Sequence, residues 1–361
     1  MEDIYLGIDV GTGSVRVGAF DAGGRLKGMG VHDIRIWRPE PDFVEQSSDD
    51  IWAAAGLAVR AALAAGGVDS ASVKGLSFDA TCSLVALGHG FEPVTVSPTG
   101  RDRQNVIVWM DHRAVKQANE INRAGHDVLK YVGGAISPEM QPPKLMWLKA
   151  HLPATWKRAR KFIDLADYMV YRASGNDRRS LCTTVCKWTY LGHDGCYDKT
   201  FFQQHGIDDL LDTGQIPELS YPMGQAAGEL TPPAAGELGL KPGIAVGVGI
   251  IDAHAGGIGV LGALLDEDLP AGPVFDDAVA LIGGTSSCHM AVSRSPRFIK
   301  GVWGPYFGAM LPDMWLNEGG QSATGALIDY VIKNNAAYPD LVKEAQSRDV
   351  DVYTHLNHIL E

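Results

Sequence analysis

Glycines, hydroxyl residues and one acid are gathered near the N-terminus in a pattern that suits phosphate binding. The segment Asp9–Arg16 reads DVGTGSVR and lies between two short apolar stretches. Tyr5–Ile8 is typical of a buried strand, and Val15, Val17 and Ala19 alternate with polar or small residues as in a second strand. The Gly-Thr-Gly-Ser link is therefore expected to form a hairpin tip, where backbone amides and hydroxyls can face an anion. An acid just before this turn suits a metal ion that accompanies phosphates.

A glycine-rich hairpin of this kind also has a purely structural interpretation. It is neither a Walker loop, since no Gly-Lys-Ser/Thr follows, nor a dinucleotide fingerprint, since no helix follows directly. However, Leu281–Val292 repeats the plan: an apolar strand, a Gly-Thr-Ser turn, and a strand in which Cys288, Met290 and Val292 alternate with other residues. Two such hairpins predict two related domains that face one nucleotide, as in the actin-like ATPase fold. The duplication favours the phosphate-binding interpretation.

Three charged residues lie where they could act on a substrate. Asp252 follows an apolar strand and precedes a glycine- and alanine-rich helix, so it could accept a proton from a hydroxyl, or simply cap the helix. Lys187 lies among apolar and aromatic neighbours; alternatively, its stem covers Trp188 while its ammonium reaches water. Glu318 precedes a double glycine, where it could bind a ligand or serve as a turn or cap acid.

The composition limits the class of protein. The chain has 361 residues, enough for two domains, and 45% hydrophobic against 20% charged residues indicates a globular protein. A net charge of −12 disfavours nucleic acids and anionic membranes as partners. The most apolar stretch, Pro242–Leu265, contains Asp252 and His254 and is rich in glycine, so we do not expect a membrane span.

Cysteine usage and the N-terminus both favour the cytoplasm. Five cysteines, an odd number, are typical of a reducing compartment, and Met-Glu-Asp-Ile lacks the basic start of a signal peptide. Cys182, Cys186 and Cys196 could be taken for a metal cluster. No paired Cys-x-x-Cys or His-x-x-x-His spacing supports that, so we interpret them as core thiols.

Strands alternate with helices along the chain, which predicts an α/β architecture. Ser47 and Ser48 offer N-caps to a helix that ends before Gly66 and Gly67, with an apolar stripe at every fourth residue. The stripe consists of Ile51, Ala55, Val59 and Leu63. Further strands are expected at residues 73–78, 106–110 and 244–248, and further helices at 113–123, 144–152, 253–265 and after Ile163 up to Ser174. Residues 270–273 are expected to connect the two domains.

Eight ordered segments carry a resemblance to a known family. The chain resembles the FGGY carbohydrate kinases over its whole length, and most closely the pentulose kinases that phosphorylate D-ribulose. The segments are Asp9–Arg16, Phe78–Ser83, Val108–Arg113, Ser137–Gln141, Cys182–Trp188, Ile251–His254, Gly284–Ser286 and Glu318–Ser322. The resemblance implies an actin-like (ribonuclease H-like) fold with an N-terminal domain at residues 1–270 and a C-terminal domain from residue 271.

The resemblance also implies the chemistry: transfer of the γ-phosphate of ATP, with Mg²⁺, to a sugar hydroxyl. Asp252 matches the catalytic base of the family, and Asp9 the carboxylate near the metal. The residues that match phosphate-binding positions are Gly11, Thr12, Arg16, Gly284 and Thr285. Those that match sugar-binding positions are Thr81, Lys187 and Glu318, with Asp111 in a related segment. Sugar and ATP are thus the expected partners, and a homodimer is left open.

Family members continue beyond the position of Glu361, so we expect the second domain to be incomplete here and most adenosine contacts to lie outside this chain. Two interpretations follow: part of a pentulose kinase, or a non-catalytic sugar-binding or regulatory protein. Within the first, D-ribulose is the expected substrate, with L-ribulose, D-xylulose and ribitol as alternatives. We expect the 361-residue chain to bind a pentulose weakly and ATP poorly, with unpartnered apolar faces around Leu327 and Val331.

Overall fold

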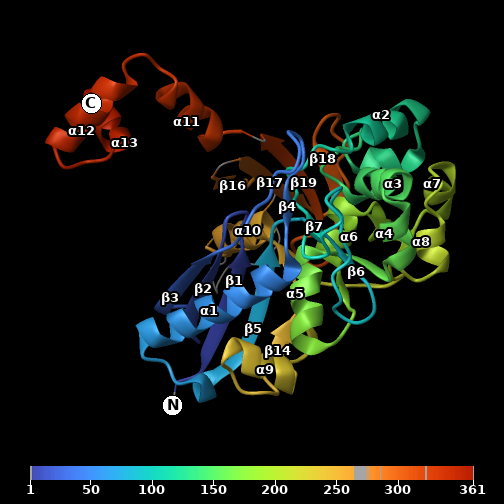
Figure 1. The fold of residues 1–361 in the computed structure, drawn as a ribbon, viewed down its shortest axis with the longest axis horizontal. Helices are drawn as coiled ribbons and strands as arrows, with labels where there is room; N and C mark the ends of the chain where they lie inside the picture. Colours follow the sequence, from blue (N-terminus) through green and yellow to red (C-terminus); the bar gives the residue numbers. More distant parts are fainter. Residues whose placement is uncertain (1, 264–274, 276, 285, 322, 361) are drawn as a thin grey trace.

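A seven-stranded sheet carries the first glycine hairpin (Figure 1). The computed structural model describes residues 2–263, 275, 277–284, 286–321 and 323–360. The strand order is β13–β14–β5–β1–β2–β3, with the short β15 also paired to β5. The strands are β1 (Ile4–Val10), β2 (Ser14–Asp21), β3 (Leu26–Asp33), β5 (Val73–Ala80), β13 (Ala226–Glu229), β14 (Ala245–Gly247) and β15 (Ile250–Ile251). β1 and β2 form the predicted antiparallel hairpin, and β5 runs parallel to β1, β14 and β15.

Helix α1 (Ser48–Gly66) packs directly on β2 and β3. It begins as predicted after Ser47, whose hydroxyl accepts the Asp50 amide, and ends before Gly67, whose φ is 59°. The four residues of the predicted stripe are all buried. The helix lies so close to β3 that a Cβ at Gly30 would stand 2.2 Å from the carbonyl oxygen of Ala58. Glycine is therefore required at this crossing.

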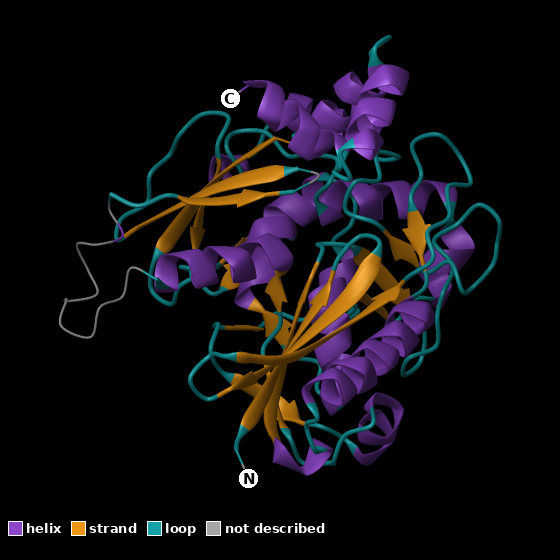
Figure 2. Ribbon diagram, turned by 90° about the vertical axis from the view of Figure 1, so that its left-hand side faces the viewer, coloured by secondary structure: helices purple, strands orange, loops and turns teal. Residues whose placement is uncertain are grey.

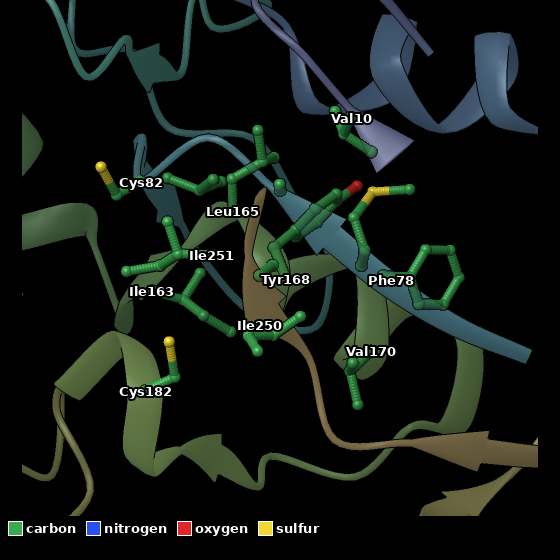
Figure 3. Packing of buried hydrophobic residues seen from close by; sticks show 14 of the residues in the cluster. Val10, Phe78, Cys82, Ile163, Leu165, Tyr168, Val170, Cys182, Ile250 and Ile251 are labelled. Carbon is green, nitrogen blue, oxygen red and sulfur yellow. The ribbon is translucent and has the colours of Figure 1, made fainter. Parts of the chain in front are cut away.

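Helix α5 (Leu165–Ser174) packs against β5, β13 and β14. It also contacts α9 (Pro232–Leu238), which in turn contacts α1. Figure 3 shows Phe78 of β5, Tyr168 and Val170 of α5 and Ile250 of β15 in one buried cluster. The core thus fixes the ends of β5 and β15, which carry the acids described below.

A second, four-stranded sheet lies beside the first in the order β4–β7–β6–β8. Its strands are β4 (Glu45–Gln46), β6 (Leu84–Leu87), β7 (Val106–Ile107) and β8 (Lys161–Asp164). The strand predicted at 106–110 ends early, at Ile107, because the chain turns there and the Asp111 amide donates to the Val108 carbonyl. The helices of this region and of the segment that follows are α2 (Val115–Ala124), α3 (Gln141–His151), α4 (Pro153–Arg158), α6 (Leu181–Lys187), α7 (Lys199–Gln204) and α8 (Asp209–Asp212).

A third sheet, antiparallel throughout, holds the second hairpin (Figure 2). Its order is β16–β17–β19–β18, from β16 (Ala280–Gly283), β17 (Ser287–Ser293), β18 (Trp303–Phe307) and β19 (Trp315–Gln321). Helix α10 (Asp252–Gly262) links the two large sheets, since it contacts both β5 and β16. The predicted connection at 270–273, and with it the boundary between residues 270 and 271, lies outside the described residues.

Helices α11 (Gly325–Lys333), α12 (Tyr338–Ser347) and α13 (Val352–Leu360) follow the third sheet and stand away from the rest of the molecule (Figure 1). Leu327 and Val331 are exposed, as predicted. The whole is an α/β protein of the actin-like ATPase type. Among the helices that the structure describes, none combines the length and apolar character needed to cross a membrane.

A buried ionic cluster joins β4 to the turn after β7. The guanidinium of Arg113 contacts Asp111 at 2.7 Å and Glu45 at 2.9 Å, and all three side chains are fully buried. The guanidinium also lies over the rings of Phe43 and Trp147, at 4.0 and 5.0 Å. Burial raises the pKa of Glu45, although Arg113 opposes the shift. Loss of the cation would leave two buried carboxyl groups without their partner.

We therefore expect Arg113→Ala to lower the free energy of unfolding by about 3–5 kcal/mol, the usual cost of breaking a buried ion pair. Urea unfolding followed by circular dichroism measures this. The matched control is Arg158→Ala, because Arg158 also pairs with an aspartate, Asp102, but at the surface. Its loss should cost less than about 1 kcal/mol. Equal effects of the two substitutions would contradict the prediction.

Candidate active site

The tip of the first hairpin is held by side chains from two other segments. The amide of Gly11 donates to the carbonyl of Ser14 at 3.0 Å, which closes the turn. Gln46 donates to the Thr12 carbonyl at 2.7 Å, and the Trp109 ring nitrogen donates to the Thr12 hydroxyl at 3.0 Å. A Cβ at Gly11 would lie 3.2 Å from the Arg16 guanidinium. The tip is thus fixed in place before any ligand arrives.

Strand register brings three aspartates to one edge of the large sheet. Asp9 in β1 is directly opposite Asp79 in β5, and Asp79 is opposite Ile250 in β15, two residues before Asp252. Arg16 lies opposite Asp9 on β2 and pairs with it at 2.8 Å. One oxygen of Asp9 is buried and has no hydrogen-bond partner among the described residues. Of the three carboxyl groups, only that of Asp9 forms an ion pair with a guanidinium among the described residues.

Burial shifts the pKa values of all three acids upward. Burial, reinforced by the charges of Asp9 and Asp252, raises the pKa of Asp79 to about 9. Burial raises the pKa of Asp9 despite the neighbouring Arg16. Burial also raises the pKa of Asp252 to about 6, against the effect of the Ala253 amide that donates to it at 2.7 Å. Such a cluster favours binding of a cation, which would relieve the repulsion.

Asp252 is the first residue of α10 and faces the cavity between the sheets. The N-cap is Ile251, not Asp252, although Asp252 does accept a backbone amide of the first turn. The carboxyl is only partly exposed, and a pKa of about 6 leaves it mostly ionised at neutral pH. A carboxylate with these properties is suited to accept a proton from a substrate hydroxyl.

Lys187 and Glu318 are both buried at the cavity wall. The ammonium of Lys187 lies 4.7 Å from the centre of the Trp303 ring, and the residue is 4% exposed. The alternative in which its head reaches water is therefore wrong. Burial opposes the charge of Lys187, but facing acidic groups including Glu318 and Glu139 outweigh it and raise its pKa well above the usual value. Glu318 lies inside β19, so the turn or cap interpretation is wrong too.

The second hairpin faces the first across the cavity. The amide of Gly284 donates to the carbonyl of Ser286 at 2.8 Å, and the Gly284 carbonyl accepts the amide of Gly325. Thr285, which was expected to bind phosphate, lies outside the described residues. Ser287 at the start of β17 exchanges a hydrogen bond of 2.9 Å with Thr324.

One cavity of about 670 Å³ unites nearly all of the predicted site. Both glycine hairpins and the acid edge of the large sheet line it. The predicted residues in its wall are Asp9, Gly11, Thr12, Arg16, Thr81, Lys187, Asp252, Gly284 and Glu318. Thr81 is buried and exchanges a hydrogen bond of 3.0 Å with Ser83.

Asp111 is not among the residues that line this cavity. It is fully buried, and both of its oxygens are occupied by Arg113 and by the backbone amides of Val44 and Arg113. Arg113 and these two amides hold its carboxylate within the protein, so the structure does not place Asp111 in the cavity wall.

Sequence reasoning gave no role to several other residues that line the cavity, among them Asp79, Trp109, Glu139 and Trp303. Asp79 carried a usable signal, because it is an acid at the end of a strand next to the strand of Asp9. Trp303 carried none, since only the fold brings β18 to Lys187. The hydrogen bond from Trp109 to Thr12 likewise joins segments 97 residues apart.

Comparison with protein families matches nearly the whole chain. Residues 4–259 match the N-terminal domain of the FGGY family of carbohydrate kinases, and residues 279–357 match the C-terminal domain of that family. A human FGGY carbohydrate kinase domain-containing protein is 47% identical over 370 residues, covering 100% of this chain and 66% of the human protein. A D-ribulokinase of Saccharomyces cerevisiae is 39% identical and covers 99% of this chain and 53% of its own length.

Solved structures share the fold at low sequence identity. A xylulose kinase from Rhodospirillum rubrum matches 95% of this chain and 66% of its own with a TM-score of 0.74 at 17% identity. A glycerol kinase from Plasmodium falciparum, crystallised with ADP, matches 96% of this chain and 67% of its own with a TM-score of 0.70 at 14% identity. The chain thus spans about two thirds of the length of the curated relatives that it matches over its full extent.

The electrostatics of the site can be measured directly. We expect the Asp252 carboxyl to titrate near pH 6, which is higher than an ordinary aspartate because burial disfavours its charged form. Asp9→Asn should lower the pKa values of Asp79 and Asp252, because one neighbouring negative charge is removed. Carboxyl carbon shifts followed by NMR across pH 3–10 would report each group.

The exposed Asp351, which directly precedes α13 outside the cavity, is the internal control for these titrations. Its curve should not move in the Asp9→Asn protein. An Asp252 curve centred at or below pH 4 would contradict the assignment of a desolvated carboxyl.

Proposed function

Because the chain belongs to the FGGY family of carbohydrate kinases, we propose that it provides the sugar site and both phosphate hairpins of an ATP-dependent pentulose kinase. D-ribulose is the proposed substrate and D-ribulose 5-phosphate the product. The observation that carries the proposal is a partly exposed carboxylate, Asp252, in a cavity walled by two glycine hairpins. The similarity to the yeast D-ribulokinase supports the choice of sugar.

The hairpins are proposed to hold the phosphates of ATP from two sides. Gly11, Thr12 and Arg16 serve the first side, and Gly284 and Thr285 the second. In phosphoryl transfer, catalysis consists mainly of alignment and of charge stabilisation, which backbone amides and a guanidinium can supply. This division assigns residues 1–270 and the chain from 271 to two domains that meet at the phosphates.

Magnesium fits the acid edge of the large sheet. Asp9 offers a buried oxygen without a partner among the described residues, and Asp79 lies directly opposite. Oxygen ligands of this kind suit Mg²⁺, which would neutralise phosphate charge when bound with ATP. We assign Asp9 as the residue that holds it, with Arg16 fixing the carboxylate orientation from β2.

Asp252 is proposed to take the proton of the attacking sugar hydroxyl. Thr81, Lys187 and Glu318 are proposed to hold the sugar: the ammonium donates, the carboxylate accepts, and both are desolvated, which strengthens these bonds. Asp111 is given a positioning role, because it anchors Arg113 and the Val44 amide beneath the wall. Closure of the cavity would exclude water, which competes with the sugar as acceptor.

We place the reaction in the cytoplasm, where the five thiols stay reduced; all five cysteines are free in the structure. Sugar and ATP are the proposed partners. A homodimer is left open.

D-ribulose is expected to be the best acceptor of the full gene product. An assay of ADP release would compare D-ribulose, L-ribulose, D-xylulose, ribitol and glycerol. A kcat/KM for another polyol more than about 10-fold above that for D-ribulose, a gap of about 1.4 kcal/mol, would refute the substrate assignment while leaving the kinase assignment intact. No ADP release with any of them, in a protein that still binds a pentulose, would favour a non-catalytic sugar-binding role.

Asp252→Asn is expected to lower kcat by about 10²–10⁴-fold in the full gene product, the usual contribution of a positioned general base. Sugar affinity, measured by calorimetry, should change much less. The matched control is Asp49→Asn, because Asp49 also lies in the first turn of a helix but outside the cavity. Near-normal turnover of a folded Asp252→Asn protein would show that the carboxylate only stabilises the helix.

A further inference from the structure

Two cysteines and one histidine meet behind the cavity wall. Cys182 and Cys186 lie one turn apart on α6, and His254 lies in the first turn of α10. Each of the three is at most 1% exposed. One ligand atom from each falls within 4.8 Å of the other two, and the Cys186 sulfur is 3.5 Å from Nε2 of His254. Sequence spacing did not point to this group, because it paired the cysteines with Cys196, which is exposed.

The distance between the Cys186 sulfur and Nε2 of His254 matches that between two ligands of a tetrahedral zinc ion. Zn–S bonds of about 2.3 Å and Zn–N bonds of about 2.0–2.1 Å place neighbouring sulfur and nitrogen atoms roughly 3.5 Å apart, and two sulfurs roughly 3.8 Å apart. A disulfide fits less well. Residues four apart on a helix have their Cβ atoms about 5–6 Å apart, whereas a disulfide needs about 3.5–4.5 Å.

A buried carboxylate lies near the same histidine but outside the group. Oε2 of Glu318 is 3.9 Å from Nε2 of His254, and this oxygen is buried with no hydrogen-bond partner among the described residues. The ligand atoms that all lie within 4.8 Å of one another belong to Cys182, Cys186 and His254.

We propose that Cys182, Cys186 and His254 form a buried structural site for one Zn²⁺ ion. Binding converts two thiols to thiolates and releases two protons, so the two thiolates balance the charge of the ion. Burial raises the pKa of the Cys186 thiol, and a bound cation reverses that effect. Burial lowers the pKa of His254 to about 4, so its imidazole is neutral and has a lone pair to donate.

The ion would tie together two helices that carry cavity residues. Cys186 immediately precedes Lys187, and His254 follows Asp252 by two residues. The site would thus hold α6 and α10 against each other behind the cavity, whatever reaction takes place there.

Native mass spectrometry of untagged protein from cells grown with added zinc tests the proposal. We expect about one zinc per chain, with a mass increase equal to one zinc less two protons. Cys182→Ser and Cys186→Ser should each reduce the zinc content to below about a tenth of an equivalent. Cys196→Ser is the matched control, because it removes a cysteine outside the cluster, and it should keep its zinc. Wild-type protein without zinc would overturn the proposal.

Cobalt titration of the wild-type protein, refolded without zinc, gives a test that does not depend on the variants folding. Cobalt bound by cysteine thiolates produces a sulfur-to-metal charge-transfer band, whereas cobalt bound by the carboxylates of Asp9 and Asp79 does not. We expect the band to saturate at one equivalent and to disappear when zinc is added. Saturating cobalt without the band would show that the three residues form an ordinary core contact.

Discussion

Three aspartates held together at the carboxyl ends of neighbouring strands of a mixed sheet impose the main constraint on this molecule. Asp9, Asp79 and Asp252 are brought together by the register of β1, β5 and β15, and that register is fixed by the buried side chains behind it. Burial and mutual repulsion disfavour three negative charges there. Arg16 on β2 offsets part of this repulsion by pairing with Asp9, and the cavity lets a cation approach the acids. The described residues at this site therefore supply less positive charge than the three acids could balance.

Aspartate has different surroundings, and so a different role, at two places in the fold. Asp111 and Asp252 each follow an apolar stretch, but Asp111 is enclosed by Arg113 and two backbone amides, whereas Asp252 has one backbone amide and the cavity. The first carboxylate is paired with Arg113 inside the protein. The second remains available for chemistry. Position relative to a guanidinium separates a structural acid from a candidate catalytic one.

The third sheet completes the site and is attached through aromatic contacts. Trp315 lies 5.0 Å from His193, ring centre to ring centre, and stacks on Tyr131 at 6.4 Å. The backbone joins too, since the amide of Gly301 donates to the carbonyl of Gly133. Through this contact Trp303 and Glu318 reach Lys187 and His254. Any movement of the third sheet would therefore change the cavity.

Local pattern determined much of this protein without the structure. Glycine and hydroxyl spacing predicted both hairpins, the four-residue apolar repeat predicted α1, and the ordered segments predicted the family and nearly the whole cavity wall, because these features depend on neighbours in sequence. Tertiary structure alone decided the rest. Sequence could not show that Asp111 is enclosed by Arg113, that Lys187 turns its ammonium to Trp303, or that His254 meets two cysteines from α6. Each of these depends on the surroundings of a charged or polar group. Except for the guanidinium two residues from Asp111, those surroundings come from segments tens of residues away.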